Sequence, residues 1–281
     1  MPAIFTHIRF GEEVVKTLPP ALKTLAQTHT QCFDLGTQGP DLLFYHKPLK
    51  KKNNPVGEKG WRLHELPSEG FFLDGAKLLL ADKANYDSEG NFAPTSAQAA
   101  YLLGFLCHFV LDCSLHPYID EHSVGGLSHG KIESELDKRH FKNLGKPIRG
   151  YNSAKRFFPL DKTLPVAASV LGVEKKNAKT AIKSMRFING FFSNRCGLVH
   201  GFCHTALTLL GIKSFQDMFI HKKDDPRCEA LWETLDTKFN DAVITANQVI
   251  AEFFGSMESS VEHNALTNEI FRYNYSGIKG E

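Results

Sequence analysis

The sequence predicts an all-α protein, a single domain of many helices around a buried apolar core. Apolar residues recur at intervals of three and four in several segments, which is helical spacing. Strand-like alternation is scarce, and the segment from Ala99 to Leu115 is apolar almost all round, as expected of a helix buried on every side. With 281 residues, of which 42% are hydrophobic and 23% charged, the chain is long enough for a sizeable core.

Residues that start and stop helices place the predicted elements. Pro19 and Pro20 interrupt or end the first helix. Thr95 and Ser96 are candidate N-caps of the central helix, and Ser128 precedes the amphipathic segment HGKIESELDKRHF. Helices are predicted at 10–30, 68–84, 95–115, in the segment after Ser128, and at 162–171, 175–194, 198–211 and 225–257. Loops rich in turn-forming residues are predicted at 47–60, 85–91 and 143–152.

Residues 1–281 are predicted to form one domain, with a motif-bearing core at 1–145, a helical remainder at 150–260 and a tail at 261–281. An alternative division near 147–160 would separate a histidine-rich half from a helical half. We favour one domain because the apolar faces at 183–211 need a packing partner.

Charge and cysteine content weigh against several classes of protein. Lys and Arg total 33 against 31 Asp and Glu, a balance that disfavours bulk electrostatic binding of nucleic acid or of an anionic membrane. The basic run Lys50–Lys52 is interpreted as part of a solvated loop.

Six cysteines without a CxxC pattern indicate reduced thiols. No secretory leader is visible and no run approaches the roughly 20 apolar residues of a membrane span, so we expect a cytoplasmic location.

The 13 histidines raise the question of metal binding, because imidazole is well suited to bind metal near neutral pH. Histidines and acids follow one another at intervals of four in two series: His108, Asp112 and His116, then His129, Glu133 and Asp137. Steps of four place side chains on one helix face, about 6 Å apart along the axis. His116 is expected at a frayed helix end, because Pro117 follows it.

A lone buried histidine is more often a hydrogen-bonded core residue than a metal ligand. A carboxylate such as Asp112 inside an apolar run is different, because leaving it unpaired costs several kcal/mol. Two helices that face each other with histidines and acids in register therefore predict a transition-metal site.

At this point the sequence resembles the zinc-dependent phospholipase C family, whose all-helical fold is shared with single-strand-specific S1/P1-type nucleases. The resemblance rests on the two series above and on three segments: MPAIFTHIRFGEEV, GTQGPDLLFYHKPL and GFLCHFVLDCSLHPYI. It covers residues 1–145, where the chain is similar to bacterial members without a signal peptide. It implies a multi-helix domain of the phospholipase C/P1 nuclease type with a buried metal cluster.

The resemblance implies the zinc ligands residue by residue. One zinc ion would be held by Asp41, His64, His108 and Asp112, a second by His116, His129 and Glu133, and a third by His7 with the bridging Asp112. In secreted relatives a mature N-terminal Trp also binds the third ion, whereas this chain begins with Met1 and Pro2. Two or three zinc ions are therefore expected.

The remaining histidines have other interpretations. His46 lies five residues after Asp41 and is the alternative to His64, which we favour because the resemblance places this ligand after the lysine-rich loop. Four others are interpreted as loop, surface or packing residues: His122, His140, and His200 with His204 beside Cys203.

The resemblance implies hydrolysis of a phosphodiester bond in a phospholipid or related phosphoester, with a metal-activated water as nucleophile and Asp41 as ligand and candidate general base. Two alternatives remain open. A single-strand nuclease or nucleotide phosphodiesterase would need aromatic platforms and a basic groove, and the sequence carries no strong nucleic-acid signal. A non-catalytic helical domain would hold structural zinc, but such sites are closed and often use Cys, which these candidates do not supply.

Overall fold

The computed structural model describes residues 4–50, 52–193, 201, 205, 220–258 and 266–280. This part of the chain is built of helices, and its β-structure is limited to two isolated bridges, Tyr86 to Phe92 and Tyr273 to Lys279. The predicted all-α class is confirmed.

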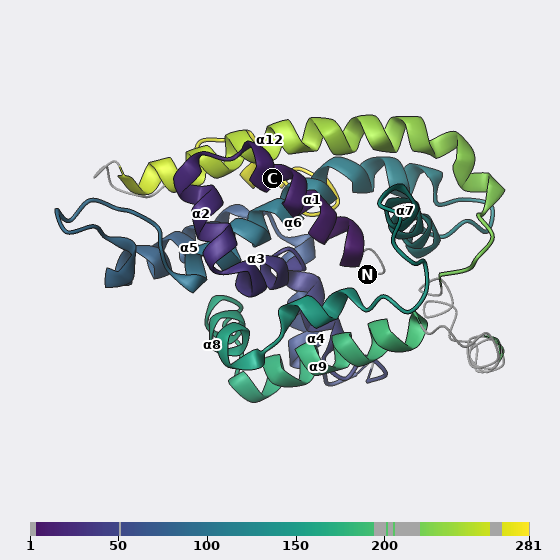
Figure 1. Cartoon of the computed structure of the whole chain (residues 1–281), viewed down its shortest axis with the longest axis horizontal. Coiled ribbons are helices and arrows are strands. Elements are labelled where there is room, and N and C mark those ends of the chain that lie inside the picture. The colour runs from purple at the N-terminus through teal and green to yellow at the C-terminus, as the bar shows by residue number, and fades with distance from the viewer. Residues whose placement is uncertain are drawn as a thin grey trace.

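Helix α6 (Ala97–His122) is the centre of the molecule (Figure 1). The Ser96 side chain accepts a hydrogen bond from the Ala99 backbone N–H and so caps its first turn. Helices α1 (Ile4–Thr17) and α12 (Trp232–Glu258) lie along one side of the molecule, and α8 (Leu160–Val170) and α9 (Lys175–Phe192) lie along the opposite side. The histidines and acids of α6 are therefore held at the middle of the fold.

The other described elements complete this arrangement around α6. They are α2 (Pro20–Thr28), α3 (Thr30–Gly36), the 3-10 helix η1 (Gly39–Tyr45), α4 (Pro55–Glu65), α5 (Glu69–Ala81), η2 (Lys83–Asn85), α7 (His129–Asn143), η3 (Ser153–Phe157), η4 (Pro226–Leu231) and η5 (Glu269–Arg272).

Two glycines allow α3 and α6 to approach each other closely. A Cβ atom on Gly36 would lie 2.1 Å from the Tyr101 carbonyl oxygen, and one on Gly104 would lie 2.2 Å from the Phe33 carbonyl oxygen. Only glycine fits at such backbone contacts. The close approach brings the Thr37 carbonyl, just after α3, to the His108 ring.

Three predicted boundaries differ from the structure. The first helix begins at Ile4 rather than residue 10 and divides at the prolines into α1 and α2. Helix α4 begins inside the predicted loop 47–60, because Asn54 caps it and Pro55 stands at its first position, where the missing N–H costs nothing. Helix α6 continues through Pro117 to His122, so His116 is not at a frayed end.

Other predicted helices are found close to the expected places, in α5, α7, α8, α9 and α12. The predicted helix 198–211, with His200, Cys203 and His204, lies outside the described residues except at Gly201 and Thr205, which are helical.

Residues 266–280, predicted as part of a tail, return to the core. Phe271 and Tyr275 are buried there, and one continuous apolar core includes residues from Ile4 to Tyr275. Among the described helices, α6 is long and apolar enough to cross a membrane, but 83% of its most apolar window is buried inside the fold, as in the core helix of a globular domain.

Candidate metal centre

The structure brings all eight predicted ligands together from five elements. His7 comes from α1, Asp41 from η1, His64 from α4, three residues from α6, and His129 and Glu133 from α7. They form three adjoining groups, in each of which the candidate ligand atoms lie within 4.8 Å of one another: His7, His108 and Asp112; Asp41, His64 and His108; and His116, His129 and Glu133.

Asp112 joins the groups. Its Oδ2 lies 3.0 Å from the Nε2 atom of His108, and its Oδ1 lies 3.3 Å from the Nε2 atoms of both His7 and His116. In the second group, Asp41 Oδ1 is 2.9 Å from His64 Nε2. In the third, Glu133 Oε1 is 3.6 Å from His116 Nε2 and 3.4 Å from His129 Nε2.

These separations suit residues that share a metal ion. Two ligands placed 2.0–2.1 Å from a tetrahedral zinc ion are about 3.3 Å apart. His108 Nε2 is buried and makes no hydrogen bond with any described residue, although Asp112 Oδ2 is close by. A buried imidazole nitrogen without a hydrogen bond, beside a carboxylate, fits a metal ligand, and a donor set of His, Asp and Glu is one that zinc accepts.

Four of the imidazoles are oriented from behind. The Nδ1 atoms of His108, His116 and His64 lie 3.1, 2.9 and 2.9 Å from the carbonyl oxygens of Thr37, Tyr275 and Gly60, respectively. His129 Nδ1 lies 2.6 Å from Asp120 Oδ1. An Nδ1–H that donates to such an acceptor leaves Nε2 free to bind a metal and fixes the plane of the ring.

His7 is placed by a different contact. Asp137 accepts hydrogen bonds from the backbone N–H groups of Phe5 (3.3 Å) and Thr6 (2.7 Å) and from the Thr6 hydroxyl (2.6 Å). It therefore caps the N-terminus of α1, one or two residues before His7. Asp137 shares a face of α7 with His129 and Glu133, but it belongs to none of the three groups.

The groups differ in their access to solvent. The side chains of His7, His108 and Asp112 are 5%, 0% and 5% exposed, whereas His129 is 32% exposed. The centre therefore has a buried end at His108 and an open end at His129.

Burial and charge act against each other in the centre. Burial alone would raise the pKa of Asp112, but the surrounding imidazoles of His108, His116 and His7 hold it below its usual range. Burial and the neighbouring His108 lower the pKa of His7 to about 4. Burial alone would also lower the pKa of His129, but Glu133 and Asp120 together raise it to about 9. The ionised carboxylates thus attract positive charge, which a divalent cation supplies.

The other histidines in the described part of the chain lie outside the three groups. His46 Nδ1 is 2.9 Å from Asn54 Oδ1, and Asn54 Nδ2 donates to the His46 carbonyl, so this pair closes the loop between η1 and α4. His122 Nδ1 lies 2.8 Å from the Tyr118 carbonyl, and the His140 ring packs near Phe239. Of the two candidates, His64 rather than His46 lies beside Asp41. Met1 and Pro2, considered above in connection with a third ion, lie outside the described residues.

The residues that orient the ligands are not among the predicted site residues. Asp120 continues the series at intervals of four from His108 to His116, but it lies beyond Pro117, where the spacing predicts that the helix has ended. The carbonyls of Thr37, Gly60 and Tyr275 carry no signal in side-chain identity, because any residue supplies this group.

Comparison with known proteins now adds to this geometry. The family described as "Zinc dependent phospholipase C" matches residues 6–194. The chain belongs to the zinc-dependent phospholipase C family. All eight predicted ligands lie within the matched residues, whereas Tyr275 lies outside them. No curated protein and no solved structure gave a significant match. Family membership implies zinc-dependent hydrolysis of the phospholipase C type, which the three groups of His, Asp and Glu also support.

Proposed function

We propose that the protein hydrolyses a phosphodiester bond of a phospholipid or a related phosphoester at this centre. The observation that supports the proposal is the convergence of histidine Nε2 atoms on Asp41, Asp112 and Glu133, while Nδ1 of four of the rings is occupied by acceptors behind them. The residues that would hold zinc are the three groups described above. Zinc there supplies positive charge to the phosphoryl oxygens and lowers the pKa of a water molecule towards 7.

The residues at the open end receive the substrate. His129 is the most exposed member, and its orientation is fixed by Asp120, so the phosphate group approaches from this side. The buried members, His7, His108 and Asp112, exclude water from the other end and hold the compensating charges in place. In a site with less water, each charge interaction with the phosphate is stronger.

Asp41 is proposed as the proton acceptor for the attacking water. Its side chain is 14% exposed, so a water molecule can reach it, and its Oδ1 is held beside His64 Nε2 at 2.9 Å. A carboxylate fixed in this way can both orient the water and accept its proton.

A panel of phosphoesters tests the proposal. The wild-type protein is assayed on phosphatidylcholine, p-nitrophenyl phosphorylcholine, single-stranded DNA and cyclic nucleotides, before and after removal of metal by a chelator and again after zinc is returned. We expect hydrolysis of the first two, its loss with chelator and its return with zinc. Hydrolysis of the DNA or the cyclic nucleotides alone would instead assign a nuclease or nucleotide phosphodiesterase.

Two variants and a matched control assign the residues. Asp41→Asn should lower kcat at least a hundredfold, about the contribution of a positioned general base. His129→Ala should lose bound zinc and activity. His122→Ala is the control, because His122 lies on α6 outside the three groups and should retain both. Full activity of His129→Ala together with lost zinc would refute the catalytic assignment, and wild-type protein without zinc would refute the metal centre itself.

A further inference from the structure

An exposed apolar and basic surface lies next to η1, the element that carries Asp41. It is formed by the loop between η1 and α4 and by the outer side of α9, and we call it the docking face: Lys47, Leu49, Lys50, Lys183, Phe187 and Phe191. Leu49 is 71% exposed and Phe187 73%, the two largest values among the large hydrophobic side chains of the described residues. The loop and the helix border one hollow of about 470 Å³, so they form one continuous surface.

The loop is held in a shape that exposes Leu49. The reciprocal hydrogen bonds of His46 and Asn54 fix its two ends. Between them, Lys47 and Asn53 adopt positive φ angles of 50° and 54°, which non-glycine residues rarely do. Such strain persists only where the surrounding structure enforces it, and it occurs more often at functional positions than elsewhere. Leu49 therefore lies in a loop whose two ends are fixed.

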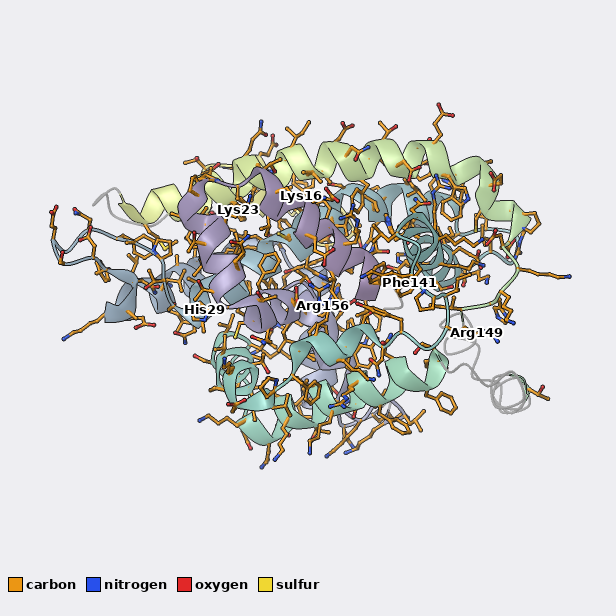
Figure 2. All side chains as sticks on the ribbon, viewed as in Figure 1. Lys16, Lys23, His29, Phe141, Arg149 and Arg156 are labelled. Carbon is orange, nitrogen blue, oxygen red and sulfur yellow. The ribbon has the colours of Figure 1, made fainter. Side chains whose placement is uncertain are left out.

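The charge around these apolar side chains has one sign. Lys179 and Lys183 precede Phe187 and Phe191 at intervals of four along α9, which puts all four on one stripe, and α9 contains no acidic residue. Nitrogen-tipped side chains project from the outer side of α9 in Figure 2. Among the described residues, no carboxylate forms an ion pair with Lys47, Lys50, Lys179 or Lys183. The net charge of +2 for the whole chain thus hides a concentrated basic region, to which Lys50 belongs.

The docking face is linked to the candidate active centre through residues that adjoin it in the chain. The loop that carries Leu49 begins directly after η1, which holds Asp41. The Phe44 ring on η1 lies 5.0 Å from the ring of His64. At the end of α9, Asn189 and Phe192 share a small cavity with Tyr45 and with Asp137, the residue that caps α1. The docking face is therefore connected to the metal centre through η1 and the end of α9.

We propose that the docking face binds the surface of an anionic lipid bilayer. Exposed Leu and Phe side chains enter the boundary between headgroups and acyl chains, while lysines around them attract anionic headgroups. A single-stranded nucleic acid would use the lysines and could stack bases on Phe187, but it would leave the aliphatic Leu49 in water. Binding of the bilayer is independent of the proposed function. Hydrolysis of lipid in the bound membrane, by contrast, rests on the proposed function.

Vesicle flotation tests the binding step without any catalytic readout. Metal-free and zinc-loaded wild-type protein are mixed with vesicles of phosphatidylcholine alone or of an equimolar mixture of phosphatidylcholine and phosphatidylserine. We expect both protein forms to bind the mixed vesicles, to bind phosphatidylcholine much more weakly, and to dissociate as salt is raised.

Two double variants and a control separate the two contributions. Leu49→Glu with Phe187→Glu should lower binding to the mixed vesicles more than about tenfold, because the apolar side chains are lost from the interface. Lys50→Gln with Lys183→Gln should lower it about 25-fold, at about fivefold for each lysine. Ile244→Glu is the matched control, because Ile244 is 62% exposed and belongs to α12, which lies on the opposite side of the molecule from α9 (Figure 1), and it should bind like the wild type.

Several outcomes would overturn the docking proposal. These are absence of wild-type binding, equal binding to both vesicle types, and equal losses in the Ile244→Glu control. Self-association of the wild type that Leu49→Glu abolishes would assign the face to a second copy of the chain instead.

The proposed function and the docking proposal can fail separately, and the assays distinguish the two failures. Vesicle binding without hydrolysis of any phosphoester refutes only the proposed function. Hydrolysis of p-nitrophenyl phosphorylcholine without vesicle binding refutes only the docking face.

Discussion

Replacing Gly104 by alanine tests how the contact between α3 and α6 supports the metal centre. The new Cβ atom would lie 2.2 Å from the Phe33 carbonyl oxygen and 2.9 Å from the Thr37 backbone nitrogen, where ordinary contact begins at 3.4 Å. Both neighbours are backbone atoms, so α3 as a whole must move away by about 1 Å. Alanine gains about 1 kcal/mol in helix propensity, whereas overpacking costs about 1–3 kcal/mol and is at its upper end against backbone. We expect a net loss of about 2 kcal/mol in the free energy of unfolding.

The same movement should reach the metal centre. It displaces the Thr37 carbonyl, which lies 3.1 Å from His108 Nδ1, and loss of such a contact lowers metal affinity about tenfold. Urea unfolding followed by circular dichroism measures the first effect, and competition with a chelator for zinc measures the second. Gly255→Ala in α12 is the control, because its Cβ would have no atom within 4 Å and should stabilise the protein by up to about 1 kcal/mol. Equal stability of the two variants, or unchanged zinc affinity in Gly104→Ala, would refute the reasoning.

Three further predictions concern single side chains. Arg156→Met should lower the free energy of unfolding by about 3 kcal/mol, because it leaves the buried Asp34 carboxylate without its partner. In the wild type this carboxylate lies 2.7 Å from Arg156 Nε. A loss no greater than about 0.5 kcal/mol in urea unfolding would contradict the prediction. Burial lowers the pKa of His140 to about 4, below its unfolded value of about 6.5, so the stability it contributes is complete above pH 6.5 and is lost as the pH falls towards 4. His140→Leu should therefore flatten the dependence of stability on pH across that window, by up to about 3 kcal/mol in a series of urea unfolding curves, and an unchanged slope would be the contrary result. Asp120→Asn should weaken zinc binding at His129 about tenfold in chelator competition, and unchanged affinity would show that the 2.6 Å contact does not orient the ring.

The helical class and the side chains that meet at the centre could be predicted from the sequence, because both depend on local spacing. Steps of four along α6 and α7 place His108, Asp112, His116, His129 and Glu133 on facing sides of two helices. The positions of His7, Asp41 and His64 required the family resemblance, since no local periodicity connects α1, η1 and α4 to α6.

The features missed by the sequence interpretation depend on contacts between distant segments. Pro117 lacks a backbone N–H and so predicts the end of the helix, yet α6 continues to His122. The carbonyl that residue 117 would bond in a helix is that of Cys113. Gly277 packs close to this carbonyl, since a Cβ on Gly277 would lie only 2.9 Å from its oxygen. The segment before α4 was interpreted as a loop because of its Pro, Gly and Asn residues. The pair Asn54 and Pro55, an N-cap followed by proline at the first position, was the local signal for the helix start.

The contact between Tyr275 and the centre has a consequence for the connectivity of the chain. The His108 ring lies 4.3 Å from the His7 ring and 5.7 Å from the Tyr275 ring. A residue of α1 and a residue of the segment 266–280 therefore meet at one imidazole. Circular permutation is favoured where the N-terminal and C-terminal segments of a chain lie near each other. A linker could join the segment after Tyr275 to the start of α1, and new ends could be opened in the exposed turn at 87–91. Such a permuted chain would retain all eight candidate ligands and the carbonyl behind His116, and its zinc content would show whether the order of the segments along the chain matters to the centre.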